Sequence, residues 1–204
     1  MRLSMLVLGV FLLSGCGAEY EPEVPKEQAS APSGKVETAV FAGGCFWCTE
    51  ADFEKVPGVI SAVSGYTGGT TDNPTYEQVS AGGTGHYEAV EVRFDPARVS
   101  YPVLAQYFFR TVDPTDATGQ FCDKGESYRT AILVAGDPQK DAAGAAKKAA
   151  GAVLKQAVVT PILPAALFWP AENYHQDYYK LNSVKYRYYR SRCGRDARLK
   201  ELWG

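Results

Sequence analysis

A short run beginning at Gly43, GGCFWCTE, holds two cysteines, Cys45 and Cys48, three positions apart. The apolar stretch at 37–41 ends at the glycines, so Cys45 is predicted to lie where a strand turns into a helix over 45–56. A helix N-terminus carries positive partial charge and free N–H groups, which lower the pKa of a thiol there and make it a better nucleophile. The alternative is a buried structural cysteine. Because glycines, a helix start and a second cysteine coincide, we interpret Cys45 as a reactive thiol.

Two large aromatic side chains, Phe46 and Trp47, stand between the cysteines. One interpretation is that they anchor the core. The other is that they form an apolar slot beside the Cys45 sulfur, which would suit a small uncharged group such as a methyl. An aromatic slot also favours developing positive charge.

A carboxylic acid is predicted on the buried face of a strand. The stretch EAVEVRF at 88–94 alternates, so Glu88 points to the same side as three apolar residues. Burial raises the pKa of a carboxyl group because it disfavours the charged form. A carboxyl group that keeps its proton near neutral pH can act as a general acid. The alternative, in which Glu88 reaches water from the first position of the strand, fits the pattern equally well.

A second acid and a phenol precede the next apolar stretch. The sequence FCDKG at 121–125 comes before a strand predicted over 128–135, which is apolar on both faces. Asp123 and Tyr128 could therefore meet at the ends of strands. By itself this signal is weak, because Asp-x-Gly stretches usually make turns.

The elements that must position these residues interleave irregularly along the chain. Strands are predicted at 37–41, 59–66, 88–94, 128–135 and 158–163, and helices at 45–56, 101–112, 137–156 and 172–181. Glycine-rich loops are predicted at 65–76 and 81–85. We expect an α+β fold, a mixed β-sheet with helices packed on it.

The beginning of the chain predicts export. An apolar run at 3–13 is too short to span a bilayer, and small residues precede Cys16. Residues 1–15 resemble a bacterial lipoprotein signal peptide, which implies acylation of Cys16. The alternative is an ordinary secretory signal with an incidental cysteine. Residues 16–34 are rich in Pro, Glu, Ser and Ala and predict a flexible tether.

The folded domain is then 35–204, anchored by lipid to the bacterial cell envelope on the extracytoplasmic (periplasmic) side, where disulfides are tolerated. The net charge of −2 gives no basic surface for nucleic acid. We expect a monomer that contacts the membrane only through its lipid anchor.

The assembled motifs resemble the peptide methionine sulfoxide reductase A family. The matching blocks lie in family order over roughly 38–181, and they are GGCFWCTE, GYTGG, NPTYEQVS, TGHYEAVEV, YFFRTVDPT, the Asp-x-Gly-x-x-Tyr-Arg block and AENYHQDYY. The resemblance implies a two-layer ferredoxin-like α/β sandwich with an extended C-terminal region. It also implies reduction of the S epimer of methionine sulfoxide, free or in proteins, and hence repair of oxidised exported proteins.

The resemblance implies roles at matching positions. Cys45 would be the nucleophile that attacks the sulfoxide sulfur, and Glu88 the acid that protonates the oxygen. The residues implied to bind substrate are a methyl pocket, two phenols and an orienting acid: Phe46, Trp47, Tyr76, Tyr128 and Asp123. Attack would leave Cys45 as a sulfenic acid, which a second thiol converts to a disulfide. No bound cofactor or metal is implied, and the external reductant would be a thioredoxin-like dithiol.

The second thiol departs from the common family pattern, in which a recycling cysteine stands in a glycine-rich tail. Here the chain ends in a basic, tyrosine-rich region that contains Cys193. We favour Cys193 as the recycling thiol, with Cys48 next because it is one helical turn from Cys45. Cys122 is a third candidate, for which a structural role is favoured.

Two other classes of protein share the pair of cysteines. A thioredoxin-like disulfide oxidoreductase also uses C-x-x-C at a helix start, but it would leave Glu88 idle. A zinc-binding module would use the spacing of Cys45 and Cys48, but Cys122 and Cys193 form no second close pair in the sequence. Activity on a free methyl sulfoxide that survives Cys48→Ser would distinguish a sulfoxide reductase from a thioredoxin-like protein. Metal analysis of the purified protein would test the zinc-binding module.

Overall fold

The computed structural model describes residues 22–26, 31 and 33–204. The predicted signal peptide and Cys16 lie outside the described residues, as does most of the predicted tether. Among the described helices, none is both long and apolar enough to cross a membrane.

A six-stranded sheet organises the domain, in the order β7-β6-β1-β3-β2-β8. Neighbouring strands are antiparallel, except that β6 and β7 are parallel. The strands are β1 (Glu37–Gly43), β2 (Val59–Thr67), β3 (Tyr87–Phe94), β6 (Thr130–Val134), β7 (Ile162–Pro164) and β8 (Phe168–Pro170).

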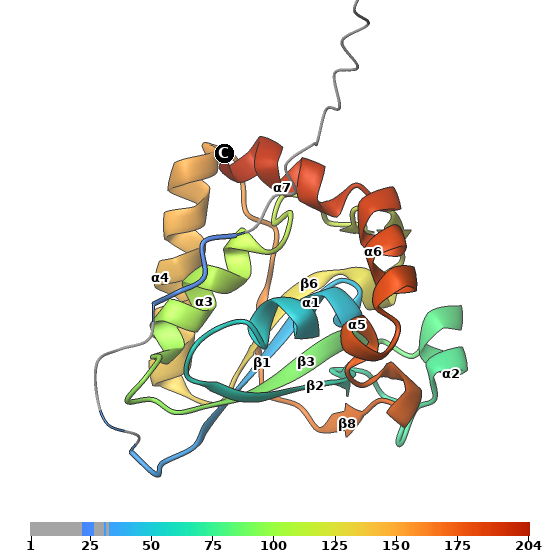
Figure 1. Cartoon of the computed structure of the whole chain (residues 1–204), viewed down its shortest axis with the longest axis horizontal. Coiled ribbons are helices and arrows are strands. Elements are labelled where there is room, and N and C mark those ends of the chain that lie inside the picture. Colours follow the sequence, from blue (N-terminus) through green and yellow to red (C-terminus); the bar gives the residue numbers. More distant parts are fainter. Residues whose placement is uncertain (1–21, 27–30, 32) are drawn as a thin grey trace, which may run out of the picture.

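The four central strands confirm the expected ferredoxin-like sandwich. They follow the order β6-β1-β3-β2, with helix α1 (Phe46–Phe53) joining β1 to β2 and helix α3 (Tyr101–Arg110) lying between β3 and β6 in the chain. Helix α4 (Asp137–Leu154) packs beside α3 (Figure 1). The result is a mixed sheet with a layer of helices, as predicted.

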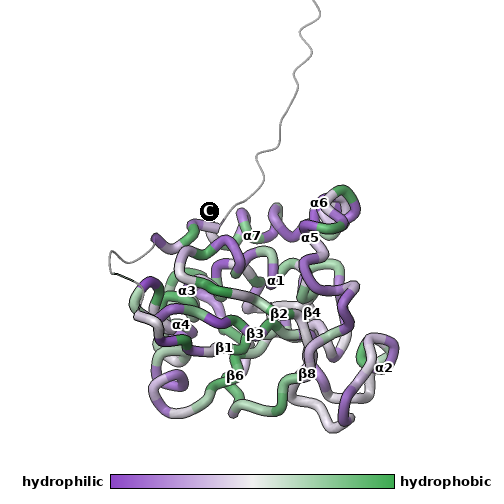
Figure 2. The backbone as a smooth tube through the Cα atoms, turned by 60° about the horizontal axis from the view of Figure 1, so that its bottom comes forward, coloured by the Kyte–Doolittle hydropathy of each residue, from purple (hydrophilic) through white to green (hydrophobic). Residues whose placement is uncertain are grey.

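The core lies between the sheet and this helical layer. Phe41 of β1 stacks on Phe53 of α1 at 4.7 Å and on Phe108 of α3 at 5.2 Å between ring centroids. The predicted alternation of β3 is confirmed, because Val90 and Phe94 are fully buried on the side that faces the helices. Figure 2 shows a hydrophobic run along β6, the strand TAILV. Burial of each such side chain stabilises the fold by about 1.5–3 kcal/mol.

Two parts of the fold were not expected from local patterns. Helix α2 (Tyr76–Ala81) begins inside a polar stretch, where Thr75 and Gln78 form a capping box. The helix predicted over 172–181 is instead a 3-10 turn, η2 (Asn173–His175), and a short helix, α5 (Tyr178–Leu181). They are separated at Asp177, which has a positive φ of 52°.

The C-terminal region forms two helices, α6 (Ser183–Arg192) and α7 (Arg195–Trp203). A small hairpin of β4 (Gly119–Gln120) and β5 (Asp123–Lys124) leads into the 3-10 turn η1 (Glu126–Tyr128). These elements bring the end of the chain back over the beginning of α1.

Candidate active site

The predicted turn from strand to helix places Cys45 at the N-cap of α1. Gly44 has a positive φ of 79°, and a Cβ atom there would lie 2.5 Å from Cβ of Gln120. Gln120 is fully buried and is held by hydrogen bonds to the backbone of Asp113. The chain can therefore make this turn only with a glycine before the cysteine.

Cys45 faces a cavity of about 70 Å³. All seven side chains predicted to be catalytic or to bind substrate line it, together with one that sequence reasoning missed: Cys45, Glu88, Phe46, Trp47, Tyr76, Asp123, Tyr128 and, unforeseen, Tyr189. These residues come from α1, α2, β3, β5, η1 and α6. The structure thus brings together residues spread over most of the domain.

Glu88 has the buried position that the alternation of β3 predicts, with 2% of its surface exposed. Its Oε2 atom accepts a hydrogen bond of 3.0 Å from the Phe46 N–H at the start of α1. Burial raises the pKa of Glu88 to about 8, although this hydrogen bond opposes the rise. The carboxyl group is therefore mostly protonated at neutral pH and can donate a proton into the cavity.

The two buried thiols behave as a pair. Cys45 and Cys48 are 6% and 1% exposed, and both are outside any disulfide. The pKa of Cys48 is lowered to about 7, chiefly by a hydrogen bond from Cys45 and also by Arg195 and Arg190, against the opposing effect of burial. The pKa of Cys45 is raised, chiefly by burial and then by its bond to Cys48.

The prediction that the helix N-terminus lowers the pKa of Cys45 is therefore wrong. Glu88 accepts the first N–H of the helix, and burial is the main cause that raises the pKa of Cys45. The two hydrogen-bonded thiols therefore titrate as a pair, and the first proton is lost near neutral pH.

Two buried cations help the hydrogen bond from Cys45 to lower the pKa of Cys48. Arg190 Nη1 lies 3.0 Å from Oδ1 of Asp52, which is one helical turn after Cys48. Arg195 is 2% exposed and donates from Nη2 to the Thr111 carbonyl at 2.6 Å, with Asp52 Oδ2 3.9 Å away. Two guanidinium groups thus lie behind Cys48 with one fully buried carboxylate between them. The sequence showed no sign of this because both arginines belong to the last two helices.

The phenols of the cavity stay protonated, so they serve as hydrogen-bond donors. Burial raises the pKa of Tyr76 and of Tyr128, whose hydroxyls are hydrogen-bonded to each other. Tyr189 donates to Oδ2 of Asp123, and burial also raises the pKa of both of these groups. Tyr189 additionally approaches the Cys45 thiol. Its only sequence signal was the cluster of tyrosines near the C-terminus.

A second pair of sulfurs borders the site. Cys122 and Cys193 form a disulfide that joins the β4–β5 hairpin to the end of α6. The Cys193 Sγ atom lies 3.8 Å from Oδ2 of Asp123, and Cys122 is exposed. The sequence favoured Cys193 as the recycling thiol. While Cys193 is bonded to Cys122, however, Cys48 is the free thiol beside Cys45. Cys122 and Cys193 are thus bonded to each other, whereas Cys45 and Cys48 are free thiols.

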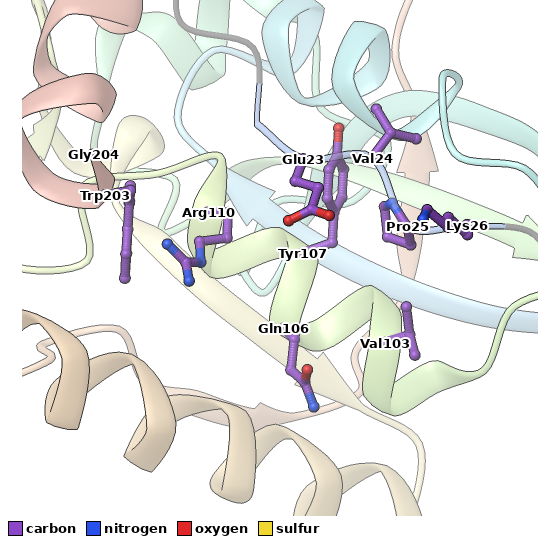
Figure 3. A pocket seen from close by; sticks show the side chains of 10 residues that line it. All are labelled: Glu23, Val24, Pro25, Lys26, Val103, Gln106, Tyr107, Arg110, Trp203 and Gly204. Atoms are coloured by element: carbon purple, nitrogen blue, oxygen red, sulfur yellow. The ribbon is translucent and has the colours of Figure 1, made fainter.

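A wider hollow of about 790 Å³ lies elsewhere on the domain, and Figure 3 shows its lining. Residues 23–26 border it on one side, α3 on another and the C-terminus on a third. The Arg110 guanidinium lies over the Trp203 ring there, 4.7 Å from the centroid. None of the predicted site residues lines this hollow, so its size does not mark it as the active site.

Comparison with known proteins decides the family. A family model described as "Peptide methionine sulfoxide reductase" matches residues 37–204. Peptide methionine sulfoxide reductase MsrA 2 of Rhizobium meliloti (strain 1021) is 54% identical over 166 residues, which span 81% of this chain and 83% of that protein. The chain belongs to the peptide methionine sulfoxide reductase A family. It is therefore an oxidoreductase that reduces methionine sulfoxide.

Other members of the reductase family agree in sequence and in fold. MsrA of Bacillus subtilis (strain 168) is 49% identical over 174 residues, which span 84% of this chain and 98% of that protein. The structure of methionine sulfoxide reductase A of Corynebacterium diphtheriae matches with a TM-score of 0.67 and 31% identity, over 78% of this chain and 83% of that one. Reduced Mxr1 of Saccharomyces cerevisiae matches with a TM-score of 0.70 and 29% identity, over 76% and 90%.

Proposed function

We propose that this reductase acts on the S epimer of methionine sulfoxide through Cys45. The Cys45 sulfur attacks the substrate sulfur and gives its own proton to Cys48, while Glu88 protonates the sulfoxide oxygen. Tyr76 and Tyr128 donate hydrogen bonds to that oxygen, and Asp123 orients the site. The oxygen then moves from the substrate sulfur to the Cys45 sulfur as the bond between the two sulfurs breaks, so that methionine leaves with the electron pair and Cys45 becomes a sulfenic acid.

One observation carries this proposal. A buried, protonated carboxyl group and a thiol pair that loses one proton near neutral pH line the same small cavity. Sulfoxide oxygen is a poor leaving group until it is protonated, so these two groups supply what the reaction needs.

Replacement of the nucleophile tests the assignment. Cys45→Ser is expected to abolish reduction of S-methionine sulfoxide, because a hydroxyl group cannot take up the oxygen. Single-turnover formation of methionine measures this directly. Near wild-type turnover in Cys45→Ser would refute the mechanism.

Recycling, we propose, begins at Cys48. Its thiolate attacks the sulfenic acid, a Cys45–Cys48 disulfide forms, and water leaves. An external thioredoxin-like dithiol then reduces the disulfide and is itself oxidised, with no bound cofactor. The yeast relative Mxr1 has been solved in complex with Trx2, at 21% identity and a TM-score of 0.52 over 73% of this chain and 88% of that one. Cys193 remains the second candidate for the recycling thiol.

Mass spectrometry of the enzyme after one equivalent of substrate tests the recycling scheme. A disulfide between Cys45 and Cys48, with Cys122–Cys193 unchanged, is expected. A disulfide between Cys45 and Cys193 would move the role to Cys193 and would also require the observed Cys122–Cys193 bond to open.

The predicted location gives the reaction a biological purpose. We propose that residues 1–15 are removed, that Cys16 is acylated, and that the monomeric domain repairs oxidised proteins outside the cytoplasm. The support is the sequence pattern before Cys16. Mass spectrometry of the N-terminal peptide from the native host tests this. An unmodified Cys16 would contradict the lipid anchor without affecting the chemistry of the site.

A further inference from the structure

The indole of Trp47 is held by a histidine from the other end of the chain. Trp47 Nε1 donates a hydrogen bond of 3.0 Å to Nδ1 of His175, which belongs to η2. His175 is 2% exposed, and its ring centroid lies 4.9 Å from that of Phe46 and 4.6 Å from that of Tyr76. His175 does not line the cavity itself. It supports three of the side chains that do.

The hydrogen bond defines the state of the ring. An indole N–H can only donate, so Nδ1 of His175 must carry no proton, and a neutral ring then has its proton on Nε2. Burial lowers the pKa of His175, which keeps the ring neutral. Its Nε2 is buried and has no hydrogen-bond partner among the described residues, with Oε2 of Glu172 4.0 Å away. Among the described residues, the hydrogen bond from Trp47 is therefore the one hydrogen bond that the ring makes.

The same short segment also holds the opposite wall. Glu172, the N-cap residue of η2, accepts from the Tyr76 N–H at 2.8 Å and from the Tyr66 hydroxyl at 2.9 Å. Glu172 and His175 are three residues apart. One turn of chain thus fixes the aromatic wall at Trp47 and the start of the helix that carries the phenol of Tyr76.

The other ring contacts of Trp47 fix the plane of its indole more than its orientation within that plane. Trp47 stacks on Tyr178 with centroids 3.8 Å apart and planes at 6°, and the edge of Tyr189 lies 5.8 Å away. Stacking fixes the plane of an indole but allows it to shift or turn within that plane. The hydrogen bond to His175 is the contact that selects one orientation in the plane.

We propose that His175 is a positioning residue that orients Trp47 as the wall for the substrate's methyl group and so sets the preference for methyl over larger sulfoxides. This rests on the proposed function, in which Trp47 faces that methyl. The wall contacts the bound substrate as well as the transition state. Loss of the orientation is therefore expected to raise KM and to leave kcat nearly unchanged.

Two substitutions separate the hydrogen bond from the bulk of the ring. His175→Phe keeps a ring but removes the acceptor, whereas in His175→Asn the side-chain oxygen can stand near the position of Nδ1. For His175→Phe we expect kcat/KM for the methyl sulfoxide to fall about 3- to 10-fold, the range of one lost hydrogen bond. The ratio of kcat/KM for the methyl sulfoxide to kcat/KM for the ethyl sulfoxide should fall. His175→Asn should restore most of the kcat/KM for the methyl sulfoxide and most of the preference for methyl over ethyl. Tyr174→Phe, at an exposed neighbouring ring, is the matched control.

A spectroscopic readout makes the test independent of catalysis. The chain has three tryptophans, so the indole N–H of Trp47 can be assigned in a ¹H–¹⁵N spectrum. We expect an upfield shift of its proton in His175→Phe and a near wild-type position in His175→Asn. Equal losses in both variants, or an unmoved indole signal in His175→Phe, would overturn the proposal.

If His175→Phe does not fold, the wild-type protein still provides a test. The ¹⁵N signals of His175 report which ring nitrogen carries the proton, and we expect it on Nε2. A proton on Nδ1 would overturn the proposal. Failure of the proposed function would show instead as turnover in Cys45→Ser, which leaves the indole signal unaffected.

Discussion

At the scale of single residues, the site depends on two groups whose pKa values lie close together near neutral pH. Burial brings the pKa of Glu88 to about 8, and a hydrogen bond from Cys45 with two nearby arginines brings that of Cys48 to about 7. The acid must keep its proton while the thiol pair gives one up. Between these two values both conditions hold for a large share of the molecules.

The pH dependence of the first turnover follows from these values. The rate should rise with pH through about 7, as Cys48 becomes a thiolate, and fall through about 8, as Glu88 loses the proton that it must donate. Rapid mixing with one equivalent of substrate across pH 6–10 measures both limbs. A rate that continues to rise above pH 9 would show that Glu88 is not the acid.

Substitution of the acid should change both the rate and the profile. Glu88→Gln is expected to slow sulfenic acid formation by about 10²–10⁴-fold, as for other lost general acids, and to remove the alkaline limb. Glu91→Gln is the matched control, because Glu91 lies on the same strand but on the opposite face and is half-buried. A single-turnover rate that barely changes in Glu88→Gln would mean that its role has been misassigned.

At the scale of elements, the turn from β1 into α1 aims the nucleophile. The turn requires the positive φ of Gly44, which residues with a side chain rarely adopt, and a close approach of Gly44 to Gln120. Helix α7 reinforces it, because the buried Arg195 reaches the Gly43 carbonyl. The position of Cys45 is thus determined by its own element and by a helix about 150 residues later in the chain.

Gly44→Ala tests the turn. A Cβ atom at φ 79° is strained and would press on the fixed side chain of Gln120, so the free energy of unfolding should fall by about 2–4 kcal/mol. Gly144→Ala is the matched control, because Gly144 lies within α4 with nothing within 4 Å of the added atom. That change should stabilise the protein by about 0.5–1 kcal/mol. Urea unfolding compares the two, and equal stabilities would contradict the role of Gly44.

At the scale of the whole molecule, the C-terminal region closes the site. Helix α6 supplies Tyr189, and the disulfide between Cys122 and Cys193 ties its end to the loop that carries Asp123. Without this closure the cavity would lose one wall. The same region places Arg190 and Arg195 behind the thiol pair.

Removal of the disulfide should loosen this closure. The bond spans 71 residues, and disulfides over loops of this size contribute about 2–4 kcal/mol, chiefly by constraining the unfolded chain. The double variant Cys122→Ser with Cys193→Ser should therefore unfold at lower temperature and lower urea concentration than the oxidised wild type. Reduced wild-type protein is the control and should behave like the double variant. Unaltered stability would show that the bond carries no structural role.

Features set by neighbouring residues could be predicted from the sequence. The turn at Cys45 and the buried face of Glu88 follow from glycine placement and from alternation along one strand, and both are observed. The positions of Tyr76, Asp123 and Tyr128 came from family resemblance, and these residues line the cavity.

Features set by distant residues could not be predicted. His175 meets Trp47 across 128 positions and Arg190 meets Asp52 across 138, and no local pattern encodes such contacts. Arg190 and Arg195 help to lower the pKa of Cys48, whereas burial raises the pKa of Cys45, which the sequence had led us to expect to be lowered. The pairing of Cys122 with Cys193 was equally hidden, because spacing does not determine which thiols meet.

The size of the hollow in front of Cys45 restricts what the enzyme can repair. About 70 Å³ accommodates the tip of one side chain, and Cys45 beside it is only 6% exposed. An oxidised methionine must therefore extend its whole side chain away from the surface of the protein that carries it. Lesions in loose termini, protruding loops or locally unfolded stretches meet this condition, and lesions locked inside an intact core do not. The order of repair in a damaged protein would then follow how readily each of its segments unravels.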